Sequence, residues 1–271
     1  MDPVLVVAAC ALLMLLAERL RPGHDLPRTR LWLPRVVALN AAQVGVVYLA
    51  ATTWDRWLPQ FRLWDAEPLG MVGGTLAGYL AITFVFYWWH RARHEVPLLW
   101  RLHQIHHSVA RLEILATFYK HPLEILINGV MTSALLYCVV GVSPGVAALC
   151  MTVAGLGELF YHWNVRTPYW LGFVFQRPES HRRHHQRGWH RSNYSDLPVW
   201  DMLFGTFDNP RRAPPHCGFA DDREMQLGRM LLGRLPHREP RWPMELDAKR
   251  RYRHQGSHAV PGRTERLDPG Q

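Results

Sequence analysis

Apolar residues gather into long runs with few polar residues in the first 163 residues of this chain, and the remainder is polar. The runs cover residues 4–17, 36–53, 69–89, 123–140 and 146–161. A helix needs about 20 mostly apolar residues to cross a bilayer core about 30 Å thick. The four later runs therefore predict membrane-spanning helices, whereas the first is short for a full crossing.

The connection between the last two runs, residues 141–145, reads Gly-Val-Ser-Pro-Gly and predicts a tight turn. These two spans then form a hairpin, so the chain leaves the third run at His90 and the fifth run at His162 on the same side of the membrane. We therefore predict an all-α fold: a polytopic membrane bundle of four to five spans with a helical, histidine-rich cap on one side.

The distribution of basic residues predicts which side carries the cap, because cytoplasmic loops of membrane proteins are rich in Lys and Arg. The loop at residues 54–68 holds two arginines against three acidic residues. The connections on the other side are strongly basic and carry Arg19, Arg21, Arg28, Arg30, Arg35, Arg91, Arg93, Arg101, Arg111 and Lys120. The cap is therefore predicted to be cytoplasmic.

The net charge of +9 does not indicate nucleic-acid binding, since the arginines lie beside acidic residues rather than in a stripe with interleaved aromatics. Three of the four cysteines lie in apolar runs and none forms a CxxC pair, so no disulfide, zinc ribbon or iron–sulfur cluster is expected. A GxxxG pattern, Gly74 to Gly78, predicts close helix packing in the third span, within the chain or in a dimer. No oligomeric state is predicted.

Histidines carry the chemistry of this sequence. Eleven of the sixteen fall between His90 and His190. Their spacing places residues three or four positions apart on one helix face, where Cβ atoms lie about 5–6 Å from each other. Such sets can converge on a metal ion. The three clusters are His90 with His94, then His103, His106 and His107, and finally His181, His184 and His185.

A continuous helix from His90 to His107 would separate its ends by about 26 Å, too far for one site. Pro97 interrupts helical hydrogen bonding and lets the segment after Val96 turn back. At least eight imidazoles exceed the four to six ligands that one ion accepts, so two metals are predicted. Imidazole suits zinc, copper, iron and nickel alike, but the lack of cysteine ligands argues against structural zinc.

The ordered set HxxxH, HxxHH and HxxHH, with a two-span hairpin before the last motif, resembles the fatty acid hydroxylase and sterol desaturase superfamily of integral-membrane diiron oxygenases. Flanking residues extend the resemblance from about His90 to Phe207. They include Tyr87-Trp88-Trp89, His121-Pro122-Leu123-Glu124, Phe160-Tyr161-His162-Trp163-Asn164, Asn193-Tyr194, Trp200-Asp201 and Leu203-Phe204-Gly205-Thr206.

The resemblance implies two iron ions, for which zinc can substitute in a purified protein, and dioxygen as co-substrate. The product would be a lipid hydroxylated or desaturated at a fatty-acyl, sterol-like or related C–H bond, with the substrate taken from the bilayer. Electrons would come from an external reductase or ferredoxin-like donor, because the sequence has no flavin, haem or dinucleotide motif of its own. The domains would be an N-terminal anchor (1–68), a catalytic domain (69–210) and a polar cytoplasmic tail (211–271).

The same resemblance assigns site residues. The metal ligands would be the eight motif histidines and His162, and no catalytic residue is expected apart from the ligands. Polar groups able to orient the imidazoles are more tentative. His190 is expected at the surface. The tentative set is His121, Glu124, Glu158, Asn164 and Asp201.

Two alternatives remain open at this point. A related histidine-rich oxygenase could act on carotenoids instead. A non-catalytic metal-binding membrane protein, such as a transporter or sensor, would need polar or ionisable residues along its spans. The spans here carry almost none besides Glu158, so an enzyme is favoured.

Overall fold

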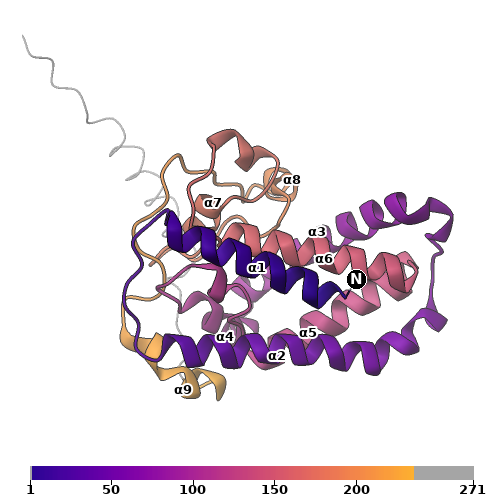
Figure 1. The fold of residues 1–271 in the computed structure, drawn as a ribbon, viewed down its shortest axis with the longest axis horizontal. Helices are drawn as coiled ribbons and strands as arrows, with labels where there is room; N and C mark the ends of the chain where they lie inside the picture. Colours follow the sequence, from indigo (N-terminus) through magenta and orange to yellow (C-terminus); the bar gives the residue numbers. More distant parts are fainter. Residues whose placement is uncertain (1, 235–271) are drawn as a thin grey trace, which may run out of the picture. The chain divides into compact units, whose positions relative to one another are not determined.

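The structure, a computed structural model, describes residues 2–234, and within that range the chain is helical with no β-strand (Figure 1). The predicted polar tail therefore lies largely outside the described residues, and the division at residues 68 and 210 stays a prediction. The long helices are α1 (Pro3–Leu20), α2 (Trp32–Thr52), α3 (Gly70–Glu95), α5 (Pro122–Ser133), its π-helical continuation η5 (Ala134–Val140) and α6 (Pro144–His162).

Among residues 2–234, five helical segments are long and apolar enough to cross a membrane, which confirms the predicted fold class. The first extends beyond its 14-residue apolar run to 18 residues, because Asp2 caps its start and the helix continues to Leu20. Residues 141–143 join η5 to α6, whose first turn is capped by Ser143. The predicted hairpin between the fourth and fifth segments is thus present.

The GxxxG pattern of α3 packs against α6 of the same chain. A Cβ atom at Gly74 would lie 3.2 Å from Val146 Cγ1, and one at Gly78 would lie 2.6 Å from Cys150 Sγ. Glycine at these positions lets the two helix backbones approach closely. The surrounding core contains Ile82, Leu135, Leu136, Ala147 and Cys150. The pattern therefore serves packing inside the chain.

We expect Gly78→Ala to lower the free energy of unfolding by about 1–3 kcal/mol through overpacking, less the 0.5–1 kcal/mol that alanine gains in a helix. The cost should shrink when Cys150→Ala is added, since the Cys150 Cβ lies 3.8 Å away. Thermal unfolding in detergent, followed by circular dichroism, measures both. Gly45→Ala is the control, because nothing lies within 4 Å of that Cβ. Additive effects of the two substitutions would contradict the packing described.

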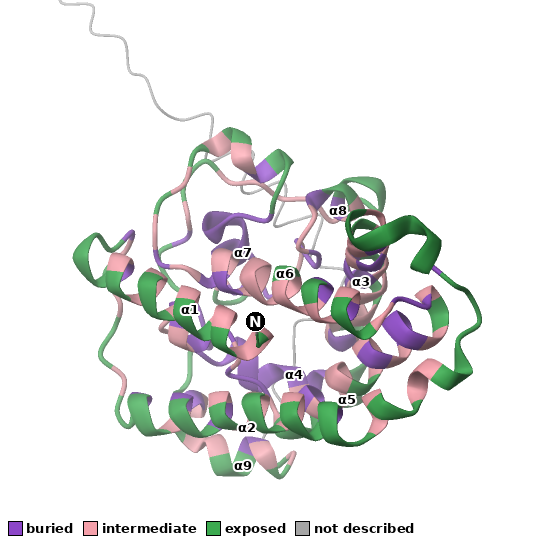
Figure 2. Ribbon diagram, turned by 45° about the vertical axis from the view of Figure 1, so that its right-hand side comes forward, coloured by how far each residue is buried: buried purple, intermediate pink, exposed green. Residues whose placement is uncertain are grey.

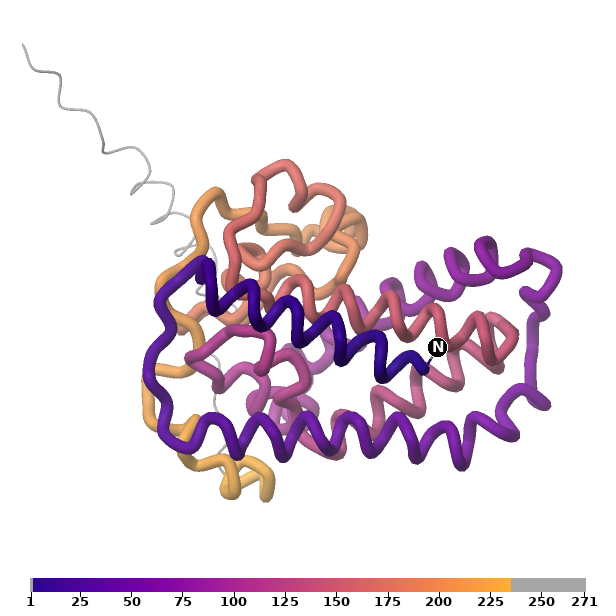
Figure 3. Tube along the Cα trace, viewed as in Figure 1, coloured from indigo at the N-terminus to yellow at the C-terminus, as the bar shows by residue number. Residues whose placement is uncertain are grey.

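Three 3-10 turns, η1 (Trp54–Arg56), η2 (Leu58–Phe61) and η3 (Glu67–Leu69), connect α2 to α3. The short helices that follow α3 form a cap at the end of the bundle where α1 ends and α2 begins (Figure 3). Most residues of the last turns of α4 and of α7 are buried, whereas α1 and α2 carry many exposed residues (Figure 2). The cap is organised by α4 (Pro97–His107), α7 (Pro178–His184), α8 (Pro198–Leu203), α9 (Leu227–Leu231) and the 3-10 turns η4 (Ile114–Ala116), η6 (Tyr169–Phe173) and η7 (Asp222–Gln226).

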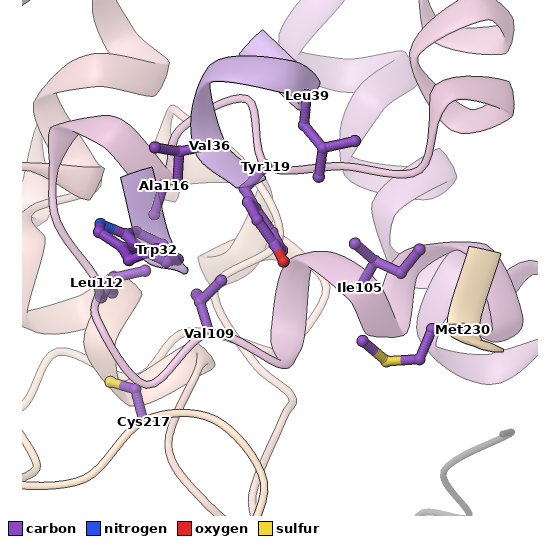
Figure 4. Close-up of a cluster of buried hydrophobic side chains, with 10 residues drawn as sticks. All are labelled: Trp32, Val36, Leu39, Ile105, Val109, Leu112, Ala116, Tyr119, Cys217 and Met230. Carbon is purple, nitrogen blue, oxygen red and sulfur yellow. The ribbon is translucent and has the colours of Figure 1, made fainter. Parts of the chain in front are cut away.

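A hydrophobic cluster fixes α4 against the start of α2 and against α9 (Figure 4). Trp32 of α2 stacks on Tyr119 with ring centroids 5.5 Å apart, and Ile105 of α4 is completely buried in the same cluster as Met230 of α9. Because Ile105 points into this core, the neighbouring His106 and His107 are directed elsewhere on the helix. The cluster therefore sets the rotation of the helix that carries the second histidine motif.

Candidate metal centre

Nine buried or partly buried histidines form two groups, each with ligand atoms within 4.8 Å of one another. Their members are His90, His94, His103, His107 and His184 in the first group, and His106, His162, His181 and His185 in the second. These are the nine residues predicted as ligands from the motifs and their flanks. The structure brings all nine together.

The break at Pro97 makes the first group possible. Helix α3 ends at Glu95, Val96 has an extended backbone (φ −95°, ψ 116°), and α4 begins at Pro97. The chain therefore turns back, and the rings of His90 and His103 lie 4.9 Å apart between centroids. A straight helix would have held these residues far apart.

Each HxxHH motif divides its histidines between the two groups. In α4 the residues at the first and last positions, His103 and His107, join the first group, and His106 joins the second. In the last motif the allocation is reversed, with His184 alone in the first group. The rings of His107 and His185 stack at 4.1 Å where the groups meet. The two groups are therefore parts of one centre.

The outer ring nitrogens are held by acceptors of the protein. His90 Nδ1 donates to the Tyr194 carbonyl (2.9 Å), His106 Nδ1 to the Tyr119 carbonyl (3.3 Å) and His184 Nδ1 to the Ser192 carbonyl (2.6 Å). His103 Nδ1 donates to Glu124 Oε1 at 3.0 Å. Each of these bonds fixes the tautomer that leaves the Nε2 lone pair free.

The inner nitrogens lack hydrogen-bond partners among the described residues. This holds for Nε2 of His90, His94, His103, His107, His184 and His185, although all of these atoms are buried. An unsatisfied buried polar atom costs about 1–3 kcal/mol, so six of them in one place require an explanation. A bound metal ion in each group would satisfy them.

The second group gives a sharper test of this fit. His106 and His162 each donate their Nδ1 hydrogen to a backbone carbonyl, at Tyr119 and Glu158. Neutral rings in that state present only lone pairs at Nε2, yet these two Nε2 atoms lie 3.3 Å apart. Two lone pairs at that distance repel each other, and a cation between or beside them would remove the repulsion. The donor set therefore fits a metal ion.

Burial also sets the charge of the cap histidines. Desolvation lowers the pKa of His184 to about 3, and it holds the pKa of His103, His106, His107, His181 and His185 below the ordinary value. Imidazole must be neutral to bind a metal. These side chains are therefore in the ligating form at neutral pH.

Three of the tentatively predicted orienting residues, Glu124, Glu158 and Asp201, are connected to candidate ligands by hydrogen bonds. Glu124 accepts from His103 and is paired with the buried guanidinium of Arg93. The carboxylate of Glu158 pairs with Lys120 Nζ (2.8 Å), and its backbone carbonyl accepts from His162. Asp201 accepts from the backbone of Tyr194, whose carbonyl holds His90.

Two of the tentative residues lie away from the histidine groups. The His121 ring caps the start of α5 by accepting from Leu123 N, and its Nε2 donates to the Leu231 carbonyl. The side chain of Asn164 bonds to the backbone of His24. Both residues have structural contacts instead of contacts with the candidate ligands.

The expectation that His190 lies at the surface is wrong. It is only 2% exposed, and its Nδ1 lies 3.0 Å from Nδ1 of His107. If His107 binds a metal through Nε2, its Nδ1 hydrogen is donated to His190. One weak signal was present in the sequence, Gly188, because the turn after the last motif needs left-handed backbone at Gly188, His190, Ser192 and Asn193.

Comparison with known proteins agrees with this geometry. The family model described as fatty acid hydroxylase matches residues 75–206, which include all nine candidate ligands. Ornithine lipid hydroxylase OlsE of Rhizobium tropici is 36% identical over 184 residues, which is 66% of this chain and 51% of that protein. No solved structure matches the chain significantly.

Two further relatives are more distant. Fatty acid hydroxylase vlmA of a Lecanicillium species is 29% identical over 63% of this chain and 48% of its own length. Human alkylglycerol monooxygenase is 30% identical over 49% of this chain and 30% of its own length. The chain thus spans about half the length of the first two relatives and less of the third.

Proposed function

Residues 75–206 belong to the fatty acid hydroxylase family, and from this we propose that the chain is a membrane-bound, dioxygen-dependent oxygenase that hydroxylates or desaturates a lipid. The observation that carries the proposal is the pair of adjoining histidine groups, in which six buried Nε2 atoms have no hydrogen-bond partner among the described residues. Relatives named for ornithine lipids, fatty acids and alkylglycerols support a lipid as the substrate class.

We assign one iron ion to each histidine group, and when bound the pair would supply the redox chemistry that activates dioxygen toward an unactivated C–H bond. Five histidines would hold the first ion and four the second. Neutral imidazoles without thiolates or carboxylates make this donor set unlike a structural zinc site.

The protein's own residues would orient and neutralise this centre. Glu124 ties the ring of His103 to Arg93, so the carboxylate fixes a ligand and compensates a buried charge at once. The Tyr194, Tyr119 and Ser192 carbonyls hold three more rings through Nδ1. Ligands held in this way keep their direction without a bound ion, which lowers the cost of metal binding.

Sidedness and electron supply complete the proposal. The cap would face the cytoplasm, as the basic loops predict, and would receive electrons from a separate reductase or ferredoxin-like protein. A positively charged cytoplasmic surface would attract an acidic donor, and that attraction would weaken with salt.

The test is an assay of iron-reconstituted protein in lipid vesicles with dioxygen, a chemical reductant and a ferredoxin–reductase pair. Mass spectrometry of the lipids should show gain of one oxygen atom or loss of two hydrogens, and neither product should form without dioxygen. Carotenoid added to the same vesicles tests the related substrate class. Stoichiometric metal without oxidation of any supplied lipid or carotenoid would favour a non-catalytic metal-binding protein.

His190 is expected to act as a positioning residue for His107. His190→Ala should weaken metal binding by about 10-fold or more, the range seen when a hydrogen-bond partner of a ligand is removed. His190→Gln should restore part of the affinity, because an amide oxygen can also accept from His107 Nδ1. Titration with a competing chelator measures the affinities.

The matched control for this experiment is His121→Ala. It removes the helix cap and a partly buried hydrogen bond at the start of α5 without touching a candidate ligand, so stability should fall while metal affinity stays near the parent value. Equal loss of metal affinity in His121→Ala and His190→Ala would assign the effect to folding rather than positioning.

A further inference from the structure

Two stretches of the polar half of the chain expose only apolar side chains or glycine. The first follows α6 and exposes Trp170, Phe173, Val174 and Phe175. The second, in and after α8, exposes Val199, Met202, Leu203 and Phe204, along with Gly205. Their exposed fractions reach 64% at Trp170 and 66% at Leu203. Such surfaces are rare on parts of a protein that face water.

The second stretch lies beside the interior of two candidate membrane helices. Ser195 Oγ donates to the Thr83 carbonyl (3.1 Å), and Trp200 Nε1 donates to Thr83 Oγ1 (3.0 Å). Asp196 packs against Gly157 of α6, where a Cβ atom would lie 3.2 Å from Asp196 Oδ2. Thr83 is six residues inside the apolar run of α3, and Gly157 is four residues inside that of α6. These positions are about 9 Å and 6 Å below the ends of the runs.

The exposed surface is continuous with the face of α3 that would meet lipid. Trp88 and Phe84 of α3 are exposed, and their rings lie 4.7 Å and 6.4 Å from that of Phe204. Phe84 also contacts Trp200 at 5.0 Å. Lipid that surrounds α3 at this level would therefore also meet α8.

The irregular backbone of this region is hydrogen-bonded internally, as membrane depth requires. The buried carboxylate of Asp201 accepts from Tyr194 N, Ser195 N and Thr206 Oγ1. The Asn193 amide donates to the Ser180 and Asp208 carbonyls. Asp201 is the one ionisable residue in residues 198–205, and it faces inward.

We propose that η6 with Val174 and Phe175, and α8 with Phe204, insert into the cytoplasmic leaflet of the bilayer without spanning it. The depth of about 6–9 Å at Thr83 and Gly157, beside α8, matches that at which interfacial helices bury their apolar faces. The inference rests on the proposed membrane location of α3 and α6. The inserted surface would be a second membrane contact, formed by the part of the chain that follows the last span.

The insertion has a direct connection to the candidate metal centre. Phe204 lies 5.1 Å from Tyr87, and Tyr87 lies 6.1 Å from Tyr194 between ring centroids. Tyr194 lies 5.4 Å from His90 and supplies the carbonyl that holds it. The lipid-facing surface and the first histidine group therefore share one aromatic wall.

Site-specific fluorescence quenching tests the proposal. The four native cysteines are replaced by alanine in the full chain, and bimane is attached at Val174→Cys or Leu203→Cys. Leu76→Cys in α3 serves as the lipid control, and Arg212→Cys serves as the water control; both parent residues are exposed. Each variant is first checked for a monodisperse profile in detergent and is then placed in phosphatidylcholine vesicles.

Two quenchers are compared: iodide in the water, and lipid spin-labelled near the glycerol end of its acyl chain. We expect bimane at residues 174 and 203 to lose fluorescence to the spin-labelled lipid and to be protected from iodide, as at residue 76. Iodide quenching at residues 174 and 203 equal to that at 212, with residue 76 protected, would overturn the insertion alone. Iodide quenching at residue 76 as well would overturn the proposed membrane location and the insertion together.

Discussion

Replacement of His106, His107, His184 and His185 by alanine is expected to reduce bound metal from about two ions per chain to none. The two groups contain five and four histidines, and this variant removes two from each. Three and two ligands would then remain, fewer than the four that a protein-held ion ordinarily uses in a closed site. Elemental analysis of detergent-purified, iron-reconstituted protein measures the change.

The control for that experiment replaces histidines that the structure places outside both groups. His24→Ala and His121→Ala together should leave the metal content unchanged, since neither residue belongs to a group. A monodisperse, helical quadruple variant that keeps its metal would refute the assignment of ligands. A parent protein that binds no stoichiometric metal after reconstitution would refute the metal centre itself.

Glu124→Ala is expected to cost about 3–5 kcal/mol, because it leaves the Arg93 guanidinium buried without its partner. Both side chains are almost fully buried, at 7% and 1% exposure. For a chain of this size the unfolding midpoint should fall by roughly 10 °C. His103 would lose its acceptor in the same variant, so metal affinity should fall about 10- to 100-fold.

A second ion pair, made by residues close to Arg93 in α3, allows the effect of burial to be separated from the effect of losing a charge. Arg91 and Glu95 form an i,i+4 ion pair in α3, but Glu95 is half exposed. Glu95→Ala should therefore cost less than about 1 kcal/mol and leave metal binding unaffected. Thermal unfolding in detergent compares the two variants, with Glu124→Gln as the conservative change at the buried site. Equal costs at Glu95 and Glu124 would contradict the buried network.

The histidine groups were predictable because helical spacing is a local property. Wherever the segment is helical, residues three or four apart share one helix face, and Pro97 marks where the chain turns. The five helical spans follow from apolar runs in the same way. These features need only neighbouring residues, so the sequence contains them explicitly.

The partners of the histidines were less predictable, because they come from residues far apart in the chain. Glu124 was identified as a candidate but its bond to Arg93 was not, and His190 was assigned to the wrong environment. Asn164 and His121 have the polar character expected of orienting residues, yet they serve loop and helix-cap contacts. Tertiary packing decides between such roles, and residue type alone does not.

The exposed apolar stretches at η6 and α8, which we propose to be inserted in the membrane, could not be predicted from the sequence for another reason. Neither is long enough to register as a span, and both lie among arginines, histidines and prolines. Only the hydrogen bonds to Thr83 and the packing on Gly157 place α8 and the residues just before it level with the apolar runs of α3 and α6. A short inserted element is therefore recognised from the membrane helices that it contacts in the folded structure, and not from its own sequence.

Each of the two HxxHH motifs supplies histidines to both groups, and this has a consequence for folding. Neither HxxHH motif can complete a group, because each gives two rings to one group and one to the other. His107 and His184 of the first group are 77 residues apart in sequence, and His106 and His181 of the second are 75 apart. A metal ion in either group would thus act as a cross-link that closes a long loop, much as a disulfide does, and would restrict the unfolded chain. Chelation should accordingly loosen the whole cap in a single cooperative step.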